Sequence, residues 1–179
     1  MQETRLADAP GGQAEARAVV ADLYEAHAVG LIRLGIVMLG DRAAAEDVVQ
    51  EAFCGLYRRW PRLADPAKAL PYVRSAVLNG CRSVRRQQRK RQGRPAGEAG
   101  PWQTAESAEA SALLNEEHRE VLAALRRLPA RQREALVLRF YLELAEPEIA
   151  AVMGISPGTV KSTTSRALAA LGRLVKDVP

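Results

Sequence analysis

The sequence predicts an all-α protein of two small helical domains joined by a flexible linker, with a helix-turn-helix in the second domain. Three observations predict this fold class. Apolar residues recur at helical spacings of three and four in both halves of the chain. No stretch shows the strict alternation of apolar and polar residues that is typical of strands. Between the halves lies a segment rich in Gly, Pro, Ala and Ser, a composition typical of linkers.

The 179 residues divide into four expected segments. Residues 1–17 are polar and interrupted by Pro and Gly, so we expect a disordered tail. Residues 18–91 should form the first helical domain, 92–112 the linker and 113–179 the second domain. The chain is 47% hydrophobic but only 4% aromatic, so both cores should consist mainly of Ala, Leu and Val.

Three helices are expected in the first domain. The first presents one apolar face and ends at Gly40, where Asp41 can cap the next helix. The second carries an apolar stripe opposite a polar one, and the proline-rich stretch 60–72 follows as a loop. The third begins at about Pro71. The expected inward residues are Tyr24, His27, Leu31, Leu34 and Met38, then Ala45, Val48, Val49, Ala52, Phe53, Leu56, Tyr57 and Trp60, then Val73, Val77, Gly80, Cys81 and Val84.

Positive charge is concentrated in the first domain. Residues 18–91 hold 13 Lys and Arg against 7 Asp and Glu, whereas residues 116–179 hold 10 against 8. The end of the third helix, "RSVRRQQRKRQGR", has seven cations and no acid. With a net charge of +5 and a pI of about 9.6, this distribution favours nucleic acid as a partner, and a solvated basic surface is the alternative.

The stretch "EIAAVMGISPGTVKSTTSRAL" has the spacing of a helix-turn-helix. Ala150 is small where the helices cross, Gly154 suits a left-handed turn, and Val160 docks the second helix. Ser156 and Pro157 suit the start of that helix. Its polar face carries no acid between Pro157 and Gly172, which favours a helix in a DNA major groove over an ordinary helical hairpin. The polar residues are Thr159, Lys161, Ser162, Thr163, Ser165 and Arg166.

A second candidate nucleic-acid surface lies on the third helix of the first domain. Ser75 and Asn79 can hydrogen-bond base edges, while Tyr72 and Arg74 can stack on unpaired bases. Trp60 and the loop after it could wall a pocket for an extruded base, although core packing is the simpler fate of its ring.

The sequence gives little support for a catalytic, cofactor, metal or redox site. His27 and His118 lie in different domains, no carboxylate pair or phosphate loop is evident, and we expect no catalytic, cofactor or metal site. Cys54 and Cys81 lack metal-ligand spacing and are expected to be small buried side chains, with a redox switch as the alternative. Neither a membrane span nor a signal peptide is evident, so we expect a cytoplasmic protein.

The chain resembles bacterial extracytoplasmic-function (ECF, group IV) RNA polymerase sigma factors. Three blocks in order carry the resemblance over about residues 18–175: "AAAEDVVQEAF", "LPYVRSAVLNGCRSVRR" and "LPARQREALVLRFYLELAEPEIAAVMGISPGTVKSTTSRAL". The resemblance implies a non-catalytic subunit that brings core RNA polymerase to promoter DNA and that an anti-sigma factor commonly holds. It implies that the first domain binds polymerase and the melted −10 element, and that the second reads the −35 element as duplex.

The resemblance also implies roles for individual residues. The polymerase-binding block corresponds to Asp47, Gln50, Glu51 and Phe53. The −10 contacts correspond to Trp60, Arg74, Ser75, Asn79, Arg82 and Arg86, with the segment 61–70 holding a flipped base. The −35 contacts correspond to Thr159, Lys161, Ser162, Ser165 and Arg166.

Three residues depart from the family pattern: Gly55, Gly80 and Pro147. A stand-alone helix-turn-helix regulator with an N-terminal sensing or dimerisation domain is the alternative function. The basic first domain argues against it.

Overall fold

The computed structural model describes residues 10–91 and 116–176, and the side chains of residues 14–91 and 120–176. All regular elements within these ranges are helical, which confirms the predicted fold class. The expected linker, residues 92–112, lies outside the described residues. Across the ranges that are described, none of the helices combines the length and the apolarity needed to cross a bilayer.

The first helical unit is a bundle of α1 (Pro10–Leu39), α2 (Arg42–Arg59) and α3 (Ala69–Arg91). Two short 3-10 helices, η1 (Trp60–Arg62) and η2 (Pro66–Lys68), connect α2 to α3. The apolar stripes predicted for the three helices meet in its core. The buried members of those stripes are Leu31, Leu34, Met38, Ala45, Val48, Val49, Ala52, Phe53, Leu56, Val73, Val77 and Cys81.

Local signals at the junction of α1 and α2 act as predicted. Gly40 has φ 74°, a left-handed conformation that ends α1. The Asp41 carboxylate then accepts a hydrogen bond of 3.1 Å from the backbone N–H of Ala44, which caps α2.

Gly80 explains one apparent departure from the family pattern. A Cβ at this position would lie 2.7 Å from Cγ1 of Val48, so the missing side chain lets α3 approach α2 closely. This close packing offsets the lower helix propensity of glycine.

The N-terminal prediction was wrong in part. α1 begins at Pro10, inside the segment expected to be a disordered tail, and Ala16 is buried. The composition looked polar because Gln13, Glu15 and Arg17 are charged or amide residues, yet these residue types are also good helix formers. Proline is tolerated at the first position of a helix, which suits a start at Pro10.

The second helical unit contains α5 (Glu116–Arg127), α6 (Ala130–Leu136), the π-helix η3 (Val137–Tyr141), α7 (Glu146–Met153) and α8 (Pro157–Lys176). A small apolar cluster joins α5, α6 and the second half of α8 through Leu128, Leu136 and Ala167. The helix-turn-helix itself, α7 and α8, packs on the same unit through Ile149, Val152 and Val160.

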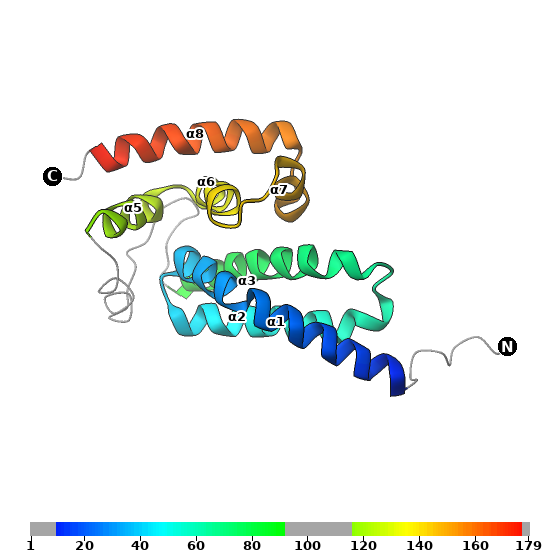
Figure 1. The fold of residues 1–179 in the computed structure, drawn as a ribbon. Helices are drawn as coiled ribbons and strands as arrows, with labels where there is room; N and C mark the ends of the chain where they lie inside the picture. The colour runs from blue at the N-terminus through cyan, green and yellow to red at the C-terminus, as the bar shows by residue number, and fades with distance from the viewer. Residues whose placement is uncertain (1–9, 92–115, 177–179) are drawn as a thin grey trace.

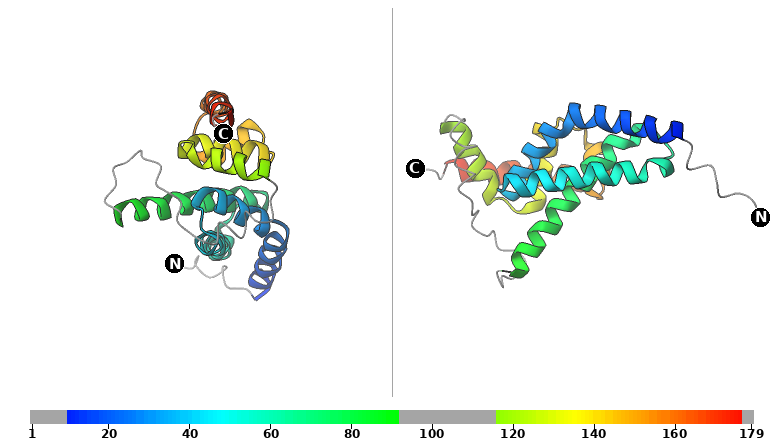
Figure 2. Two further views of the ribbon diagram at one scale, coloured as in Figure 1. Left: turned by 90° about the vertical axis from the view of Figure 1, so that its left-hand side faces the viewer. Right: turned by 90° about the horizontal axis from the view of Figure 1, so that it is seen from below.

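The two units pack directly against each other in two layers, with α1–α3 in one and α5–α8 in the other (Figure 1). One continuous apolar cluster runs from Val73 and Val77 of α3 to Val152 and Met153 of α7. α8 lies on the side of its layer that faces away from α1–α3, and the last turns of α3 project beyond both layers (Figure 2). The sequence predicted two tethered domains but not this shared core.

Candidate nucleic-acid interface

The turn between α7 and α8 has the geometry that the sequence predicted. Gly154 has φ 66°, and the backbone N–H of Ile155 donates to the carbonyl of Ala150 at 3.1 Å. The Ser156 hydroxyl accepts a hydrogen bond of 3.2 Å from the backbone N–H of Thr159 and caps α8. Val160 is fully buried, so it docks α8 against the rest of the unit.

The predicted −35 residues share the outer face of α8. All five are exposed: Thr159, Lys161, Ser162, Ser165 and Arg166. The hydrogen bonds found for them stay within the start of α8. Ser162 donates to the Thr159 carbonyl at 3.1 Å, and Nε of Arg166 donates to the Ser162 carbonyl at 3.1 Å. The face is therefore accessible to a ligand as large as duplex DNA.

Thr163 is a correction to the predicted polar face. Its side chain is buried, in one row with Val160 and Ala167 at spacings of three and four. A threonine is small enough to pack in that row, and its polarity alone had suggested an outward position.

The predicted −10 residues on α3 lie in a different setting, because several of them face α6 and α7. The Ser75 hydroxyl lies 3.5 Å from the carbonyl oxygen of Val152, at the limit of a hydrogen bond. The guanidinium of Arg74 lies 3.9 Å from the carboxylate of Glu148, and burial lowers the pKa of Arg74, an effect that Glu148 partly offsets.

Arg82 makes a charge-assisted polar contact between the two units. Its Nε and Nη2 donate to the two carboxylate oxygens of Glu134 at 3.1 and 2.6 Å, which is a bidentate pair. Its Nη1 also donates to Oδ1 of Asn79 at 2.8 Å. The Glu134 side chain is 1% exposed, and Nη1 of Arg131 lies 3.4 Å from the same carboxylate.

Glu134 and Arg133 are residues that sequence analysis missed. Arg133 is fully buried and donates to the Arg126 carbonyl at 3.1 Å. Burial, and next the nearby charge of Arg85, lower the pKa of Arg133 to about 9, so it still carries its charge at neutral pH. In the sequence both residues look like part of an ordinary charged helix. The only available signal was their place between buried apolar residues of α6.

The basic end of α3 begins at the contact with α6, where Arg85 lies near Arg133, and continues into exposed turns. Arg86, Lys90 and Arg91 are exposed on the turns that project from the molecule (Figure 2). Arg85 is partly buried near α6, and burial, followed by the charge of Arg89, lowers its pKa. A surface of this kind, with cations on a projecting helix, suits contact with phosphates.

Trp60 begins η1 and is partly buried against the core of the first unit. The side chain therefore packs partly against the core, which is the simpler of the two roles expected for Trp60. In the following loop, the Asp65 carboxylate accepts a hydrogen bond of 3.0 Å from the backbone N–H of Ala67 and caps η2.

The predicted polymerase-binding residues divide into three exposed positions and one buried one. Asp47, Gln50 and Glu51 are exposed on α2, and Glu51 pairs with Arg58. Phe53 was expected at the polymerase-binding surface, but it is only 4% exposed, so it is a core residue and not a direct surface contact. Its ring meets Tyr24 edge-on with centroids 5.0 Å apart.

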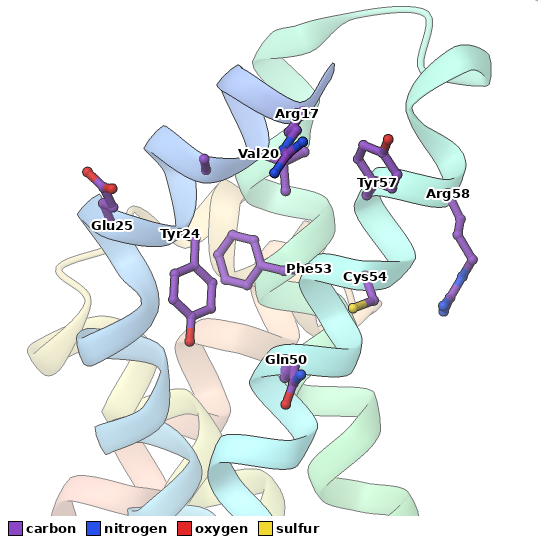
Figure 3. Close-up of a pocket in the computed structure, with 10 residues that line it drawn as sticks. Arg17, Val20, Tyr24, Glu25, Gln50, Phe53, Cys54, Tyr57 and Arg58 are labelled. Carbon is purple, nitrogen blue, oxygen red and sulfur yellow. The ribbon is translucent and has the colours of Figure 1, made fainter. Parts of the chain in front are cut away.

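A groove between α1 and α2 adjoins these residues (Figure 3). Gln50 and the edge of Phe53 line it from α2, and Tyr24 lines it from α1. Tyr24 and Tyr57 are 43% and 42% exposed, so the groove offers aromatic surface to a partner.

The two cysteines differ from each other. Cys81 is buried as predicted, and burial raises its pKa to about 12, which keeps the thiol neutral and unreactive. Cys54 was also expected to be buried, but it is exposed on the polar side of α2 beside Arg58. It belongs to the polar stripe of α2, where helical spacing places it with Asp47, Gln50 and Arg58.

Comparison with known families identifies both units. Residues 23–91 match the family "Sigma-70 region 2", and residues 118–171 match "Sigma-70, region 4". The chain therefore belongs to the RNA polymerase sigma factors, the proteins that direct RNA polymerase to promoters. Since both halves match sigma regions, the alternative of a stand-alone regulator is not supported.

Curated relatives narrow the class to the ECF sigma factors. The chain is 32% identical to the ECF RNA polymerase sigma factor SigL of Mycobacterium tuberculosis, over 97% of this chain and 98% of that one. It is 33% identical to the RNA polymerase sigma-E factor of Streptomyces antibioticus, over 79% of this chain and 76% of that one. A similar match to the probable sigma factor RfaY of Xanthomonas campestris, at 33% identity over 76% of this chain, spans only 35% of that longer protein.

Solved structures share the fold. CnrH in complex with the cytosolic domain of CnrY superposes with a TM-score of 0.68 at 22% identity, over 94% of this chain and 99% of that one. The sigma factor RpoE of Bartonella quintana, solved with the anti-sigma factor NepR, gives 0.63 at 21% identity, over 93% and 98%.

Proposed function

We propose that this sigma factor reads a promoter with two separate helices and contacts core RNA polymerase with a third. The observation that carries the proposal is the outer face of α8, which is exposed, cationic and free of acid at the start of a helix-turn-helix. A helix with this face can enter a major groove beside phosphates.

At the −35 element, Lys161, Ser162 and Ser165 contact base edges, and Thr159 and Arg166 contact phosphates. Their short side chains and the start of α8 support this division, because a recognition helix meets base edges with its N-terminal residues.

At the −10 element, α3 binds the melted strand. Asn79 reads a base, Arg74 and Ser75 lie one turn earlier, and the cations from Arg82 to Arg91 hold the backbone. The projecting basic end of α3 supports this role, because single strands need a broad positive surface as well as groups that stack on or bond to the bases.

Core polymerase contacts the exposed stripe of α2. Asp47, Gln50 and Glu51 offer polar groups, and the adjacent groove offers Tyr24 and Tyr57 as partly exposed aromatic surface. Phe53 supports this surface from below by packing against Tyr24.

We also place this chain in group IV of the sigma factors and propose that an anti-sigma factor holds it in the cytoplasm. The relationship to SigL supports the group, and the fold shared with RpoE, which was solved with the anti-sigma factor NepR, supports the partner.

Run-off transcription tests the main proposal. The purified chain and core RNA polymerase are incubated with a promoter library, and transcripts are sequenced. We expect products whose upstream DNA shares two short elements. Core polymerase alone is the control, and a lack of any product that depends on the chain would contradict the proposal.

A further inference from the structure

The side chain of Asn79 is held by Arg82 from within the same helix. Nη1 of Arg82 donates to Oδ1 of Asn79 at 2.8 Å. The two residues are three positions apart, so they are neighbours on one face of α3. Their hydrogen bond therefore needs no contact with any other element of the chain.

An arginine selects which end of the Asn79 amide faces it. A guanidinium carries five N–H donors and no acceptor, so only the carbonyl oxygen of an asparagine amide can bond to it. Here this places Oδ1 of Asn79 toward Arg82 and leaves Nδ2 as the group that can donate to a base edge. A glutamine at position 82 would not make this selection, because its own amide both donates and accepts.

Arg82 is itself fixed in place. Its Nε and Nη2 donate to the two carboxylate oxygens of Glu134 at 3.1 and 2.6 Å, and its side chain is 27% exposed. Nη1 takes no part in this fork and is the nitrogen that bonds to Asn79. A side chain whose rotamer is locked by hydrogen bonds holds its neighbour in a more precise position than a mobile one does.

We propose that Arg82 is a positioning residue for base recognition, which fixes the Asn79 amide so that Nδ2 meets an acceptor on a base of the melted −10 strand. The proposal rests on the proposed role of Asn79, and it gives Arg82 a function beyond contact with the strand backbone. An amide that is already oriented loses less conformational freedom on binding, and it discriminates against a wrong base because it does not reorient to suit that base.

The two functions of Arg82 predict different readouts. Loss of a backbone contact weakens binding about equally for all sequences, whereas loss of a base contact relaxes specificity at the position that is read. The test is competitive run-off transcription with the full chain and core polymerase on pre-melted templates that carry each of the four bases at every −10 position. Base preference is the ratio of product from the best and the worst base within one preparation, so it does not depend on how much of a variant is folded.

Asn79→Ala identifies the position that Asn79 reads, and Arg82→Gln is the test variant. A base read by one side chain is preferred by about fivefold or more, and we expect Arg82→Gln to lower this ratio below about twofold. Preferences at the other −10 positions should stay at their wild-type values. In an Asn79→Ala background, Arg82→Gln should change no preference further.

Arg86→Gln is the matched control, because it removes one cation from an exposed site on the next turn of α3. It should reduce transcription from all templates by a similar factor and leave every base preference unchanged. An equal fall of preference in Arg86→Gln at the position that Asn79 reads would overturn the positioning role, because loss of charge alone would then explain the effect.

Failure of this proposal can be told apart from failure of the proposed function. If Asn79→Ala removes a preference that Arg82→Gln keeps, only the positioning role of Arg82 is overturned. If Asn79→Ala leaves every preference unchanged, the reading role proposed for Asn79 fails, and the positioning role fails with it. Loss of promoter-dependent transcription in the wild type would instead contradict the role in promoter recognition.

Discussion

The polar faces of α8 and α3 have similar residue types but opposite surroundings. Lys161, Ser162 and Arg166 on α8 are exposed, and Ser162 and Arg166 form hydrogen bonds within their own helix. Arg74, Ser75 and Arg82 on α3 face carboxylates and a carbonyl of the other unit. The residue types alone would suggest two equally open DNA-binding faces.

The two faces are similar in amino-acid composition but differ in solvent accessibility, which composition does not show. In the packed chain the outer face of α8 is exposed, whereas Arg82 of α3 is paired with Glu134 of α6. The two recognition events should therefore respond differently to the same mutations.

Lys161→Ala should give the largest loss. We expect binding of the full chain with core polymerase to duplex −35 DNA to weaken by about 1–3 kcal/mol, as for other single contacts to base edges. Initiation from a template with a pre-melted −10 segment and no −35 element should stay at the wild-type level. Lys176→Ala removes the same side chain from the last turn of α8 and is the control. A defect of Lys161→Ala on the pre-melted template would contradict the assignment.

Asn79→Ala should show the complementary pattern. Because Asn79 is proposed to read a base of the melted strand, its loss should reduce initiation on both templates, by a similar or smaller factor. Gln87→Ala, an exposed polar residue two turns further along α3, is the control. Equal defects of Asn79→Ala and Lys161→Ala on the pre-melted template would refute the division between the two helices.

Local signals made α8 predictable. Gly154, Ser156 and Pro157 mark the turn and the start of the helix, and each acts through the backbone within a few residues. The acid-free outer face could be read in the same way. Thr163 was misplaced because its inward position depends on the row it shares with Val160 and Ala167, and its polarity pointed the other way.

The surroundings of α3 could not be predicted from the sequence. Helical spacing correctly placed Val73, Val77 and Cys81 in a core, yet it carries no information about which distant element covers the remaining face. Arg82 and Glu134 lie 52 positions apart, and each looks like a solvated charge within its own helix. Their pairing follows from the packing of two folded units and not from any local pattern.

Gly80→Ala tests how closely α3 is held on its inner side, next to Asn79. The added Cβ would lie 2.7 Å from Val48, and overpacking of this kind costs about 1–3 kcal/mol, against a gain of up to about 1 kcal/mol in helix propensity. We expect the free energy of unfolding to fall by about 1 kcal/mol, measured by urea denaturation. Gly158→Ala on α8 is the matched control, because nothing lies within 4 Å of its added Cβ, and it should be neutral or stabilising. Equal stability of the two variants would mean that α3 is no more constrained than α8.

The cysteines should give the smallest effect on function, and they test whether the inner side of α3 stays closed. Cys54 is exposed, whereas Cys81 is buried with its pKa raised to about 12, so at pH 8 only Cys54 should react quickly with Ellman's reagent. The second thiol should appear only after denaturation, and Cys54→Ser should remove the fast one. Diamide should leave run-off transcription unchanged, because a neutral buried thiol cannot pair with an exposed one. Two rapidly reacting thiols in the native chain would show that the first unit opens around α3. The difference between α3 and α8 would then arise because α3 is loosely packed, and not because the second unit covers it.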